Sequence, residues 1–166
     1  MNLVNPENET NRLAEQVGKL LLERHLNVSC AESCTGGGIA YAITSVAGSS
    51  AWFNQSWVTY SNLAKQQQLG VSIETLSSYG AVSEQTAHAM VEGVVTQSQA
   101  DIAVSVTGIA GPGGGSPEKP VGLVWFGFSI NGKPSVMAQQ FAGNREQVRT
   151  QAIHFALGFL IERLVE

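Results

Sequence analysis

Apolar residues recur at helical spacing in several segments of the chain. Leu13, Val17 and Leu21 lie four positions apart, as on one face of an amphipathic helix. Ser83 is a favoured N-cap residue and stands directly before another helix-compatible segment. The helices predicted in this way cover, in chain order, residues 10–25, 36–46, 62–69, 84–97 and 145–165.

Other segments are short and have the alternating or β-branched character of strands. Val28 and Cys30 alternate with more polar neighbours. The dipeptide Asn131-Gly132 separates two strand-like segments and predicts a two-residue hairpin turn between them. The predicted strands cover residues 27–32, 57–61, 102–106, 121–130 and 134–142.

The order of these elements predicts the fold class. Helices and strands alternate early in the chain and a hairpin follows late, which is typical of an α/β domain. We expect a mixed, mostly parallel sheet covered by helices, formed by a single domain over residues 10–166 behind a flexible tail at residues 1–9. Sites in such sheets form where strands run into loops. Here those loops are residues 32–38, 60–65 and 107–115.

Charge and hydropathy exclude several function classes. Only 13% of the residues are charged, the formal net charge is −4, and no Lys/Arg cluster occurs, so we expect no nucleic-acid partner. No run of 18 apolar residues exists, and the polar start of the chain does not resemble a signal peptide. We therefore expect a protein of the cytoplasm without a membrane partner.

The supply of metal-binding residues is poor. The chain has two cysteines, Cys30 and Cys34, three scattered histidines and one aspartate, Asp101. This set provides neither a disulfide framework nor the usual ligands of zinc or magnesium sites. We expect no metal and no cofactor.

Ser33 is the first residue with a candidate chemical role. It lies at the end of a predicted strand, directly before the glycines at 36–38, where backbone N–H groups can hold an oxyanion. Ser33 would then be a nucleophile, whereas the alternative is an ordinary N-cap serine before a glycine turn. Cys34 is a second possible nucleophile, or a small packed residue.

Lys65 and Tyr60 follow the second predicted strand. A lysine near the start of a helix is disfavoured as a cation by the helix dipole, which lowers its pKa and suits a general base toward a serine. Tyr60 could hydrogen-bond within the same site. The alternative for Lys65 is a solvated lysine on the helix surface.

A glycine-rich loop and one arginine are candidates for anion binding. Residues 108–115 follow a predicted strand, and their backbone amides could form a nest for a phosphate. The loop has neither the lysine of a Walker motif nor a following helix, so a flexible connection is the alternative. Arg145, at the start of the last helix, could clamp a phosphate or carboxylate, or could be a surface arginine without a specific role.

Taken together, these segments resemble the CinA C-terminal-domain family over about residues 11–165. The matching motifs are Ala-Glu-Ser-Cys-Thr-Gly-Gly at 31–37, Thr-Tyr-Ser-Asn-x-x-Lys at 59–65, Gly-Ala-Val-Ser at 80–83 and Gly-Ile-Ala-Gly-Pro-x-Gly-Gly-Ser at 108–116. The probability that four motifs match in the same order by chance is very small.

The resemblance implies a three-layer α/β/α sandwich and a specific activity. Stand-alone members of the family are nicotinamide-nucleotide amidases, which hydrolyse the carboxamide of nicotinamide mononucleotide (NMN) to nicotinic acid mononucleotide and ammonia within the pyridine nucleotide cycle. By motif matching, the resemblance places the catalytic serine, lysine and tyrosine at Ser33, Lys65 and Tyr60, and it implies a homo-oligomer. We expect the substrate-binding residues to be Thr35, Gly36, Gly37, Asn62, Thr107, Gly108, Gly111, Gly114 and Arg145.

Two other functions remain open from the sequence. Another amide or a nucleotide pyrophosphate could be the substrate, although pyrophosphate hydrolysis usually needs a metal held by carboxylates. A non-catalytic nucleotide-binding or competence- and damage-associated module would use the glycine-rich loop and leave Ser33 and Lys65 without a joint role.

Overall fold

The computed structural model describes residues 5–166 and contains one five-stranded sheet in the order β2-β1-β3-β4-β5. The strands are β1 (Val28–Glu32), β2 (Phe53–Val58), β3 (Ile102–Gly108), β4 (Leu123–Ile130) and β5 (Lys133–Gln140). β1 pairs in parallel with both β2 and β3, whereas β4 is antiparallel to β3 and β5. Four of the five strands therefore point the same way, and only β4 runs back.

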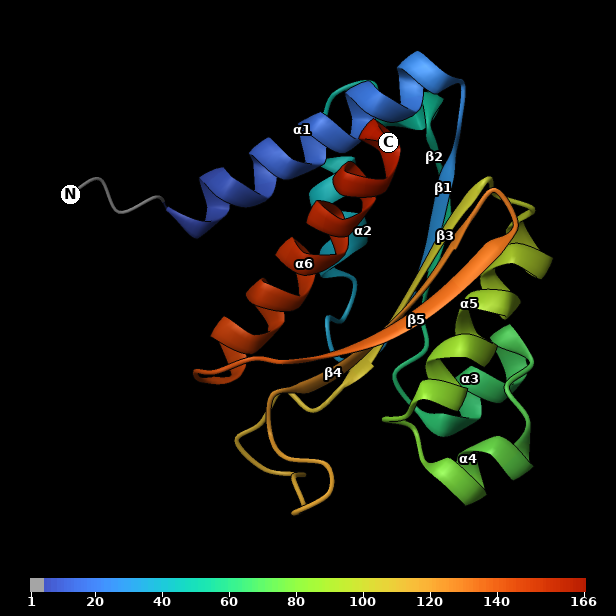
Figure 1. Cartoon of the computed structure of the whole chain (residues 1–166), viewed down its shortest axis with the longest axis vertical. Coiled ribbons are helices and arrows are strands. Elements are labelled where there is room, and N and C mark those ends of the chain that lie inside the picture. Colours follow the sequence, from blue (N-terminus) through green and yellow to red (C-terminus); the bar gives the residue numbers. More distant parts are fainter. Residues whose placement is uncertain (1–4) are drawn as a thin grey trace.

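Helices cover both faces of this sheet. They are α1 (Pro6–Arg24), α2 (Gly38–Thr44), α3 (Asn62–Leu69), α4 (Ile73–Tyr79), α5 (Glu84–Ser98) and α6 (Arg145–Val165), with a short 3-10 helix, η1 (Ser49–Ala51). Figure 1 shows α1, α2 and α6 on one face and α3, α4 and α5 on the other. The expected α/β/α layering with a mixed sheet is confirmed.

Each face of the sheet buries its own apolar core. The larger core lies under α1, α2 and α6 and includes Phe126 and Phe128 of β4. Phe128 stacks on Phe159 of α6 with ring centroids 4.1 Å apart. The smaller core lies under α5 and includes Met90 and Val94. Burial on both faces keeps the ends of β1 and β3 in fixed positions, which is what a site built on their loops requires.

The first helix begins earlier than the sequence pattern indicated. Asn5 accepts a hydrogen bond from the Glu7 N–H through its side chain, and Pro6 occupies the first helical turn, so residues 6–9 are helical rather than part of a tail. The rest of the expected tail, residues 1–4, lies outside the described residues.

The second strand and the fourth helix also differ from expectation. β2 spans Phe53–Val58 instead of 57–61, and Ser61 is the N-cap of α3. β2 is an edge strand with mostly half-buried residues, which explains its weak apolar pattern. α4 was not predicted at all. Its N-cap is Ser72, whose hydroxyl accepts a hydrogen bond from Thr75.

The hairpin prediction is confirmed. Asn131 and Gly132 have φ values of 50° and 79°, the left-handed pair that a tight hairpin between β4 and β5 requires.

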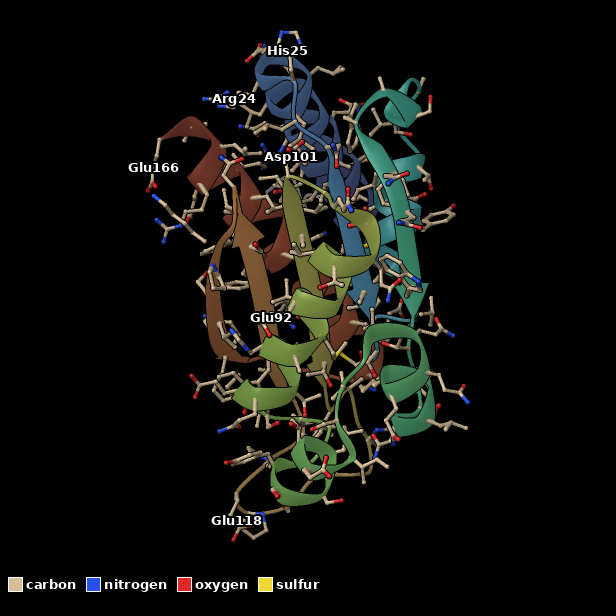
Figure 2. All side chains as sticks on the ribbon, turned by 90° about the vertical axis from the view of Figure 1, so that its right-hand side faces the viewer. Arg24, His25, Glu92, Asp101, Glu118 and Glu166 are labelled. Carbon is tan, nitrogen blue, oxygen red and sulfur yellow. The ribbon has the colours of Figure 1, made fainter. Side chains whose placement is uncertain are left out.

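The two ends of the sheet carry different chemistry. Asp101, the only aspartate, lies directly before β3, where its Oδ2 accepts hydrogen bonds from both nitrogens of Asn27 at 2.9 Å. Figure 2 shows Asp101 and Glu118 at opposite ends of the molecule, with Glu118 on the loop that follows β3. Asp101 is therefore structural and distant from the loops at the carboxyl ends of the parallel strands. Among residues 5–166, no helix is long and apolar enough to cross a membrane.

Candidate active site

The loops that follow β1, β2 and β3 meet around one pocket at the carboxyl edge of the parallel strands. The pocket has a volume of about 270 Å³. Ser33 directly follows β1, Lys65 comes from α3 after β2, and residues 107–114 leave the end of β3. Parallel pairing brings these strand ends to a common edge, although the residues lie far apart in the sequence.

Ser33 and Lys65 are in direct contact. The Lys65 Nζ lies 3.1 Å from the Ser33 Oγ, and it also donates to the main-chain carbonyls of Thr59 at 2.8 Å and Tyr60 at 3.3 Å. Only 1% of the Lys65 surface is exposed. The lysine is thus a buried amine held against a hydroxyl, not a surface cation.

Burial changes the acidity of this amine. It lowers the pKa of Lys65 from its ordinary value of 10.5 to about 8, an effect that a thiolate at Cys34 would oppose. Within residues 5–166, no carboxylate lies within ion-pair distance of Lys65 to stabilise the cation. A neutral amine, which can accept the proton of Ser33, is therefore accessible near physiological pH.

Cys34 lines the same pocket but is poorly suited to be the nucleophile. Its side chain is buried, and burial raises the pKa of the thiol to about 12. The reactive form of cysteine is the thiolate. Of these two neighbouring residues, Ser33 is in contact with the base Lys65, whereas Cys34 has an unreactive, protonated sulfur.

Glu32 is a buried carboxylate that the sequence analysis did not single out. Its Oε1 accepts hydrogen bonds from the Thr35 hydroxyl at 2.6 Å and the Ile39 N–H at 2.8 Å, and its Oε2 accepts from the Ala40 N–H at 3.1 Å. These donors belong to the turn after Ser33 and to the start of α2. Glu32 therefore fixes the shape of the turn that carries the candidate nucleophile. A glutamate within a mostly apolar, buried strand needs polar partners, and this feature of the sequence could have indicated its structural role.

Arg145 and Tyr60 lie together at the rim of the pocket. The Arg145 Nη1 donates to the Gly111 carbonyl at 2.7 Å, and its Nη2 donates to the Tyr60 hydroxyl at 3.2 Å. Tyr60 thus reaches Lys65 through its backbone carbonyl, whereas its hydroxyl points to Arg145. Arg145 therefore connects the glycine-rich loop to the loop after β2 through these two hydrogen bonds. Its positive charge lies at the opening of the pocket.

One wall of the pocket comes from the end of β3 and the loop that follows it. Thr107, Gly108, Gly111 and Gly114 all line the pocket. The Thr107 hydroxyl donates to the Ala81 carbonyl at 2.8 Å, so its side chain fastens the connection before α5. The glycine at 108 permits close packing, because a Cβ there would lie 2.8 Å from the Leu123 carbonyl.

Four of the expected substrate-binding residues do not line the pocket. Thr35 is buried and directed toward Glu32, and Asn62 is exposed at the start of α3. Gly36 and Gly37 form the turn with φ values of 61° and 97°. The Gly36 N–H already donates to the Ser33 carbonyl at 3.0 Å.

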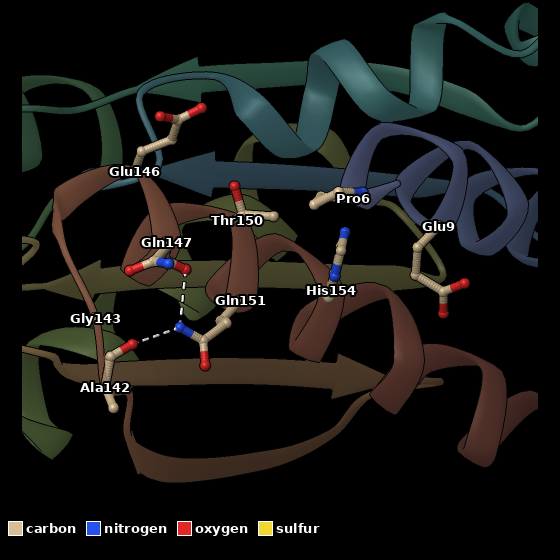
Figure 3. A pocket seen from close by; sticks show the side chains of 9 residues that line it. All are labelled: Pro6, Glu9, Ala142, Gly143, Glu146, Gln147, Thr150, Gln151 and His154. Carbon is tan, nitrogen blue, oxygen red and sulfur yellow. Dashed lines mark hydrogen bonds between the residues drawn. The ribbon is translucent and has the colours of Figure 1, made fainter. Parts of the chain in front are cut away.

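A larger pocket, of about 760 Å³, lies elsewhere, between the first turns of α1 and α6. Figure 3 shows its lining, with His154 beside Pro6 and Glu9. The His154 Nε2 is 2.6 Å from the Thr10 hydroxyl, and none of the residues expected in the site lines this pocket. The Ser33–Lys65 contact therefore locates the candidate chemistry in the smaller pocket. Over the described part of the chain, no group of three or more His, Cys, Asp or Glu residues could hold a metal ion.

Comparison with known proteins identifies the family of this chain. The family model described as the CinA C-terminal domain matches residues 10–164. The chain belongs to the CinA C-terminal domain family. Among its relatives in this family, the "Nicotinamide-nucleotide amidohydrolase PncC" of Enterobacter agglomerans is 53% identical, with 96% of this chain and 98% of the relative covered. The protein of the same name from Escherichia coli strain K12 is 49% identical over the same shares.

Solved structures of the CinA family share the fold over the whole domain. The competence/damage inducible protein CihA from Agrobacterium tumefaciens superposes with a TM-score of 0.92 at 45% identity, covering 100% of both chains. A CinA superfamily protein from Klebsiella pneumoniae gives a TM-score of 0.91 at 38% identity, covering 94% of this chain and 98% of the other.

Proposed function

We propose that this chain hydrolyses the carboxamide of NMN to nicotinic acid mononucleotide and ammonia, as a step of the pyridine nucleotide cycle. The observation that carries the proposal is the contact of 3.1 Å between a buried, pKa-lowered lysine and a serine at the end of β1. The names of two relatives, at 53% and 49% identity over nearly the full length, supply the substrate.

The first half of the reaction forms an acyl-enzyme. The Ser33 Oγ attacks the carboxamide carbon while neutral Lys65 takes the hydroxyl proton. The tetrahedral intermediate collapses, the C–N bond breaks, and Lys65 returns the proton to the leaving nitrogen, which departs as ammonia. The Ser33 ester of nicotinic acid mononucleotide remains.

The second half of the reaction regenerates the serine. Lys65 takes a proton from a water molecule, the resulting hydroxide attacks the ester carbon, and the proton returns to the Ser33 oxygen. The product is nicotinic acid mononucleotide, whose carboxyl group loses its proton to solvent. Arg145 and the backbone N–H groups of Gly111, Gly113 and Gly114 would bind the phosphoribosyl end at the rim of the pocket.

Ammonia release from NMN by the purified chain tests the proposal. Ser33→Ala should lose at least about 1000-fold in kcat, whereas Cys34→Ser, the matched change at the next position, should retain most activity. Hydroxylamine added during turnover should intercept the ester and yield a hydroxamate, which mass spectrometry detects. A chain that binds NMN without releasing ammonia would instead be a nucleotide-binding module, and loss of activity on chelation by EDTA would contradict a serine–lysine mechanism.

A further inference from the structure

Arg149 of α6 directs its charge at the main chain next to the nucleophile. Its Nε donates to the Cys34 carbonyl at 3.1 Å, and its Nη2 donates to the Thr35 carbonyl at 3.3 Å. The side chain is half-buried, and within residues 5–166 no carboxylate forms an ion pair with it. A guanidinium without a carboxylate partner therefore lies on the turn after Ser33.

This contact constrains the direction of a backbone amide. In a trans peptide group the C=O and N–H bonds point in opposite directions. The Ser33 carbonyl accepts from the Gly36 N–H, and the Cys34 carbonyl accepts from Arg149. The other ends of these two peptide groups are the N–H groups of Cys34 and Thr35, which point away from those partners. Cys34 lines the pocket, whereas Thr35 is fully buried and does not.

The glycine at position 36 belongs to the same arrangement. Gly36 has a φ of 61°, and a Cβ at this position would lie 3.2 Å from the Arg149 Nη2. A side chain at 36 would therefore both strain the turn and crowd the guanidinium. The absence of a side chain at Gly36 thus leaves room for the guanidinium of Arg149, which is 113 positions away in the sequence.

Arg145 and Arg149 are one helical turn apart on one face of α6, and they contact different parts of the site. Arg145 reaches the rim of the pocket through Gly111 and Tyr60, whereas Arg149 holds the turn that follows Ser33. Two donors from one guanidinium fix the orientation of the turn more firmly than a single hydrogen bond would. The positive charge of the guanidinium also favours negative charge that develops nearby in a transition state.

We infer that Arg149 is a positioning residue for the reaction. It fixes the turn at Cys34 and Thr35, and so holds the Ser33 hydroxyl and the Cys34 N–H in the positions from which they attack the carboxamide and stabilise the oxyanion. The inference rests on the proposed function for the identity of the substrate. The reactivity of Ser33 can be tested without that substrate. Arg149 itself does not touch the substrate, so it affects the rate of acyl transfer rather than the affinity.

Steady-state kinetics with NMN separate this role from substrate binding. Arg149→Met should lower kcat by about 10- to 100-fold, below the loss typical of deleting an oxyanion donor outright, and should change KM less than about threefold. Arg149→Lys, which keeps the charge but not the two-pronged geometry, should recover only part of kcat. In Arg149→Ala, added guanidinium ion should raise kcat and ethylammonium should not. Arg163→Ala, on the exposed end of the same helix, is the matched control and should behave as wild type.

A second readout does not depend on NMN. Labelling of Ser33 by a fluorophosphonate probe also builds negative charge on an oxygen beside the serine, so Arg149→Met should slow labelling by a similar factor. A wild-type chain that is labelled but releases no ammonia from NMN would refute the proposed function and leave Arg149 to be judged by the labelling rates. A raised KM with unchanged kcat, labelling as fast as in wild type, or no response to guanidinium would overturn the inference. A wild-type chain inert in both assays would overturn both.

Discussion

The Lys65 Nζ lies between the Ser33 hydroxyl and the two backbone carbonyls of Thr59 and Tyr60. Protonated lysine donates to all three oxygens. When the amine is neutral, its two N–H groups can stay on the carbonyls, and its lone pair faces the Ser33 hydroxyl. The carbonyls therefore aim the base at the nucleophile without adding a negative charge that would raise the pKa of the lysine.

The pH dependence of the rate should follow Lys65. Because the amine must be neutral and burial lowers its pKa to about 8, kcat/KM should rise with pH through an apparent pKa near 8 and level off above it. Lys65→Arg should be nearly inactive at every pH, because guanidinium keeps its proton. Initial rates of ammonia release between pH 6 and pH 10 (about two units either side of that pKa) test this, and an active Lys65→Arg enzyme with the wild-type profile would exclude Lys65 as the base.

The same shift predicts a pH-dependent stability. The folded pKa of about 8 lies below the ordinary 10.5, so the unfolded chain binds more protons between these values and stability rises with pH in that window. Relative to Lys65→Met, the wild-type free energy of unfolding should increase by up to about 3 kcal/mol across the window. Urea titrations of both proteins at pH 7.5 and 10.5 measure the difference, in which the other titrating groups cancel. A constant difference would mean that Lys65 titrates as an ordinary exposed lysine.

Glu32 should stabilise the fold and the nucleophile turn together. Glu32→Gln places an amide NH₂ where only donors approach, so at least one of the bonds from Thr35, Ile39 and Ala40 is lost. We expect a loss of about 2 kcal/mol in the free energy of unfolding, together with a fall in kcat. Glu92→Gln on the exposed face of α5 is the control and should change stability by less than about 0.5 kcal/mol. Equal stabilities of the two variants would contradict the role given to Glu32.

Arg145 should act on the phosphate end of the substrate. Arg145→Ala should raise KM for NMN about 10-fold with a smaller change in kcat, since the guanidinium lies at the rim and not at Ser33. Nicotinamide riboside lacks the phosphate and is the matched substrate: its kcat/KM should be nearly the same for wild type and variant. An equal loss with both substrates would show that Arg145 supports the glycine-rich loop instead.

Much of the architecture follows from local sequence signals. The helical spacing of Leu13, Val17 and Leu21 and the hairpin at Asn131-Gly132 depend on residues close in the chain, and the structure contains both elements. Local signals failed where neighbours in space decide the outcome. β2 is a half-buried edge strand, and its apolar pattern is too weak to show where it begins and ends.

The sequence by itself determined the family motifs, which contain Ser33, Lys65 and the glycine-rich loop. Only the tertiary structure decided which atoms meet there. It directed the Tyr60 hydroxyl to Arg145 and the Thr35 hydroxyl to Glu32, and it placed Arg149 behind the turn. A polar side chain has many possible partners in the chain, and the one it binds depends on distances set by the packing of α3 and α6 around the sheet. The burial that lowers the pKa of Lys65 arises from the same packing. The residues next to Lys65 in the sequence do not indicate it.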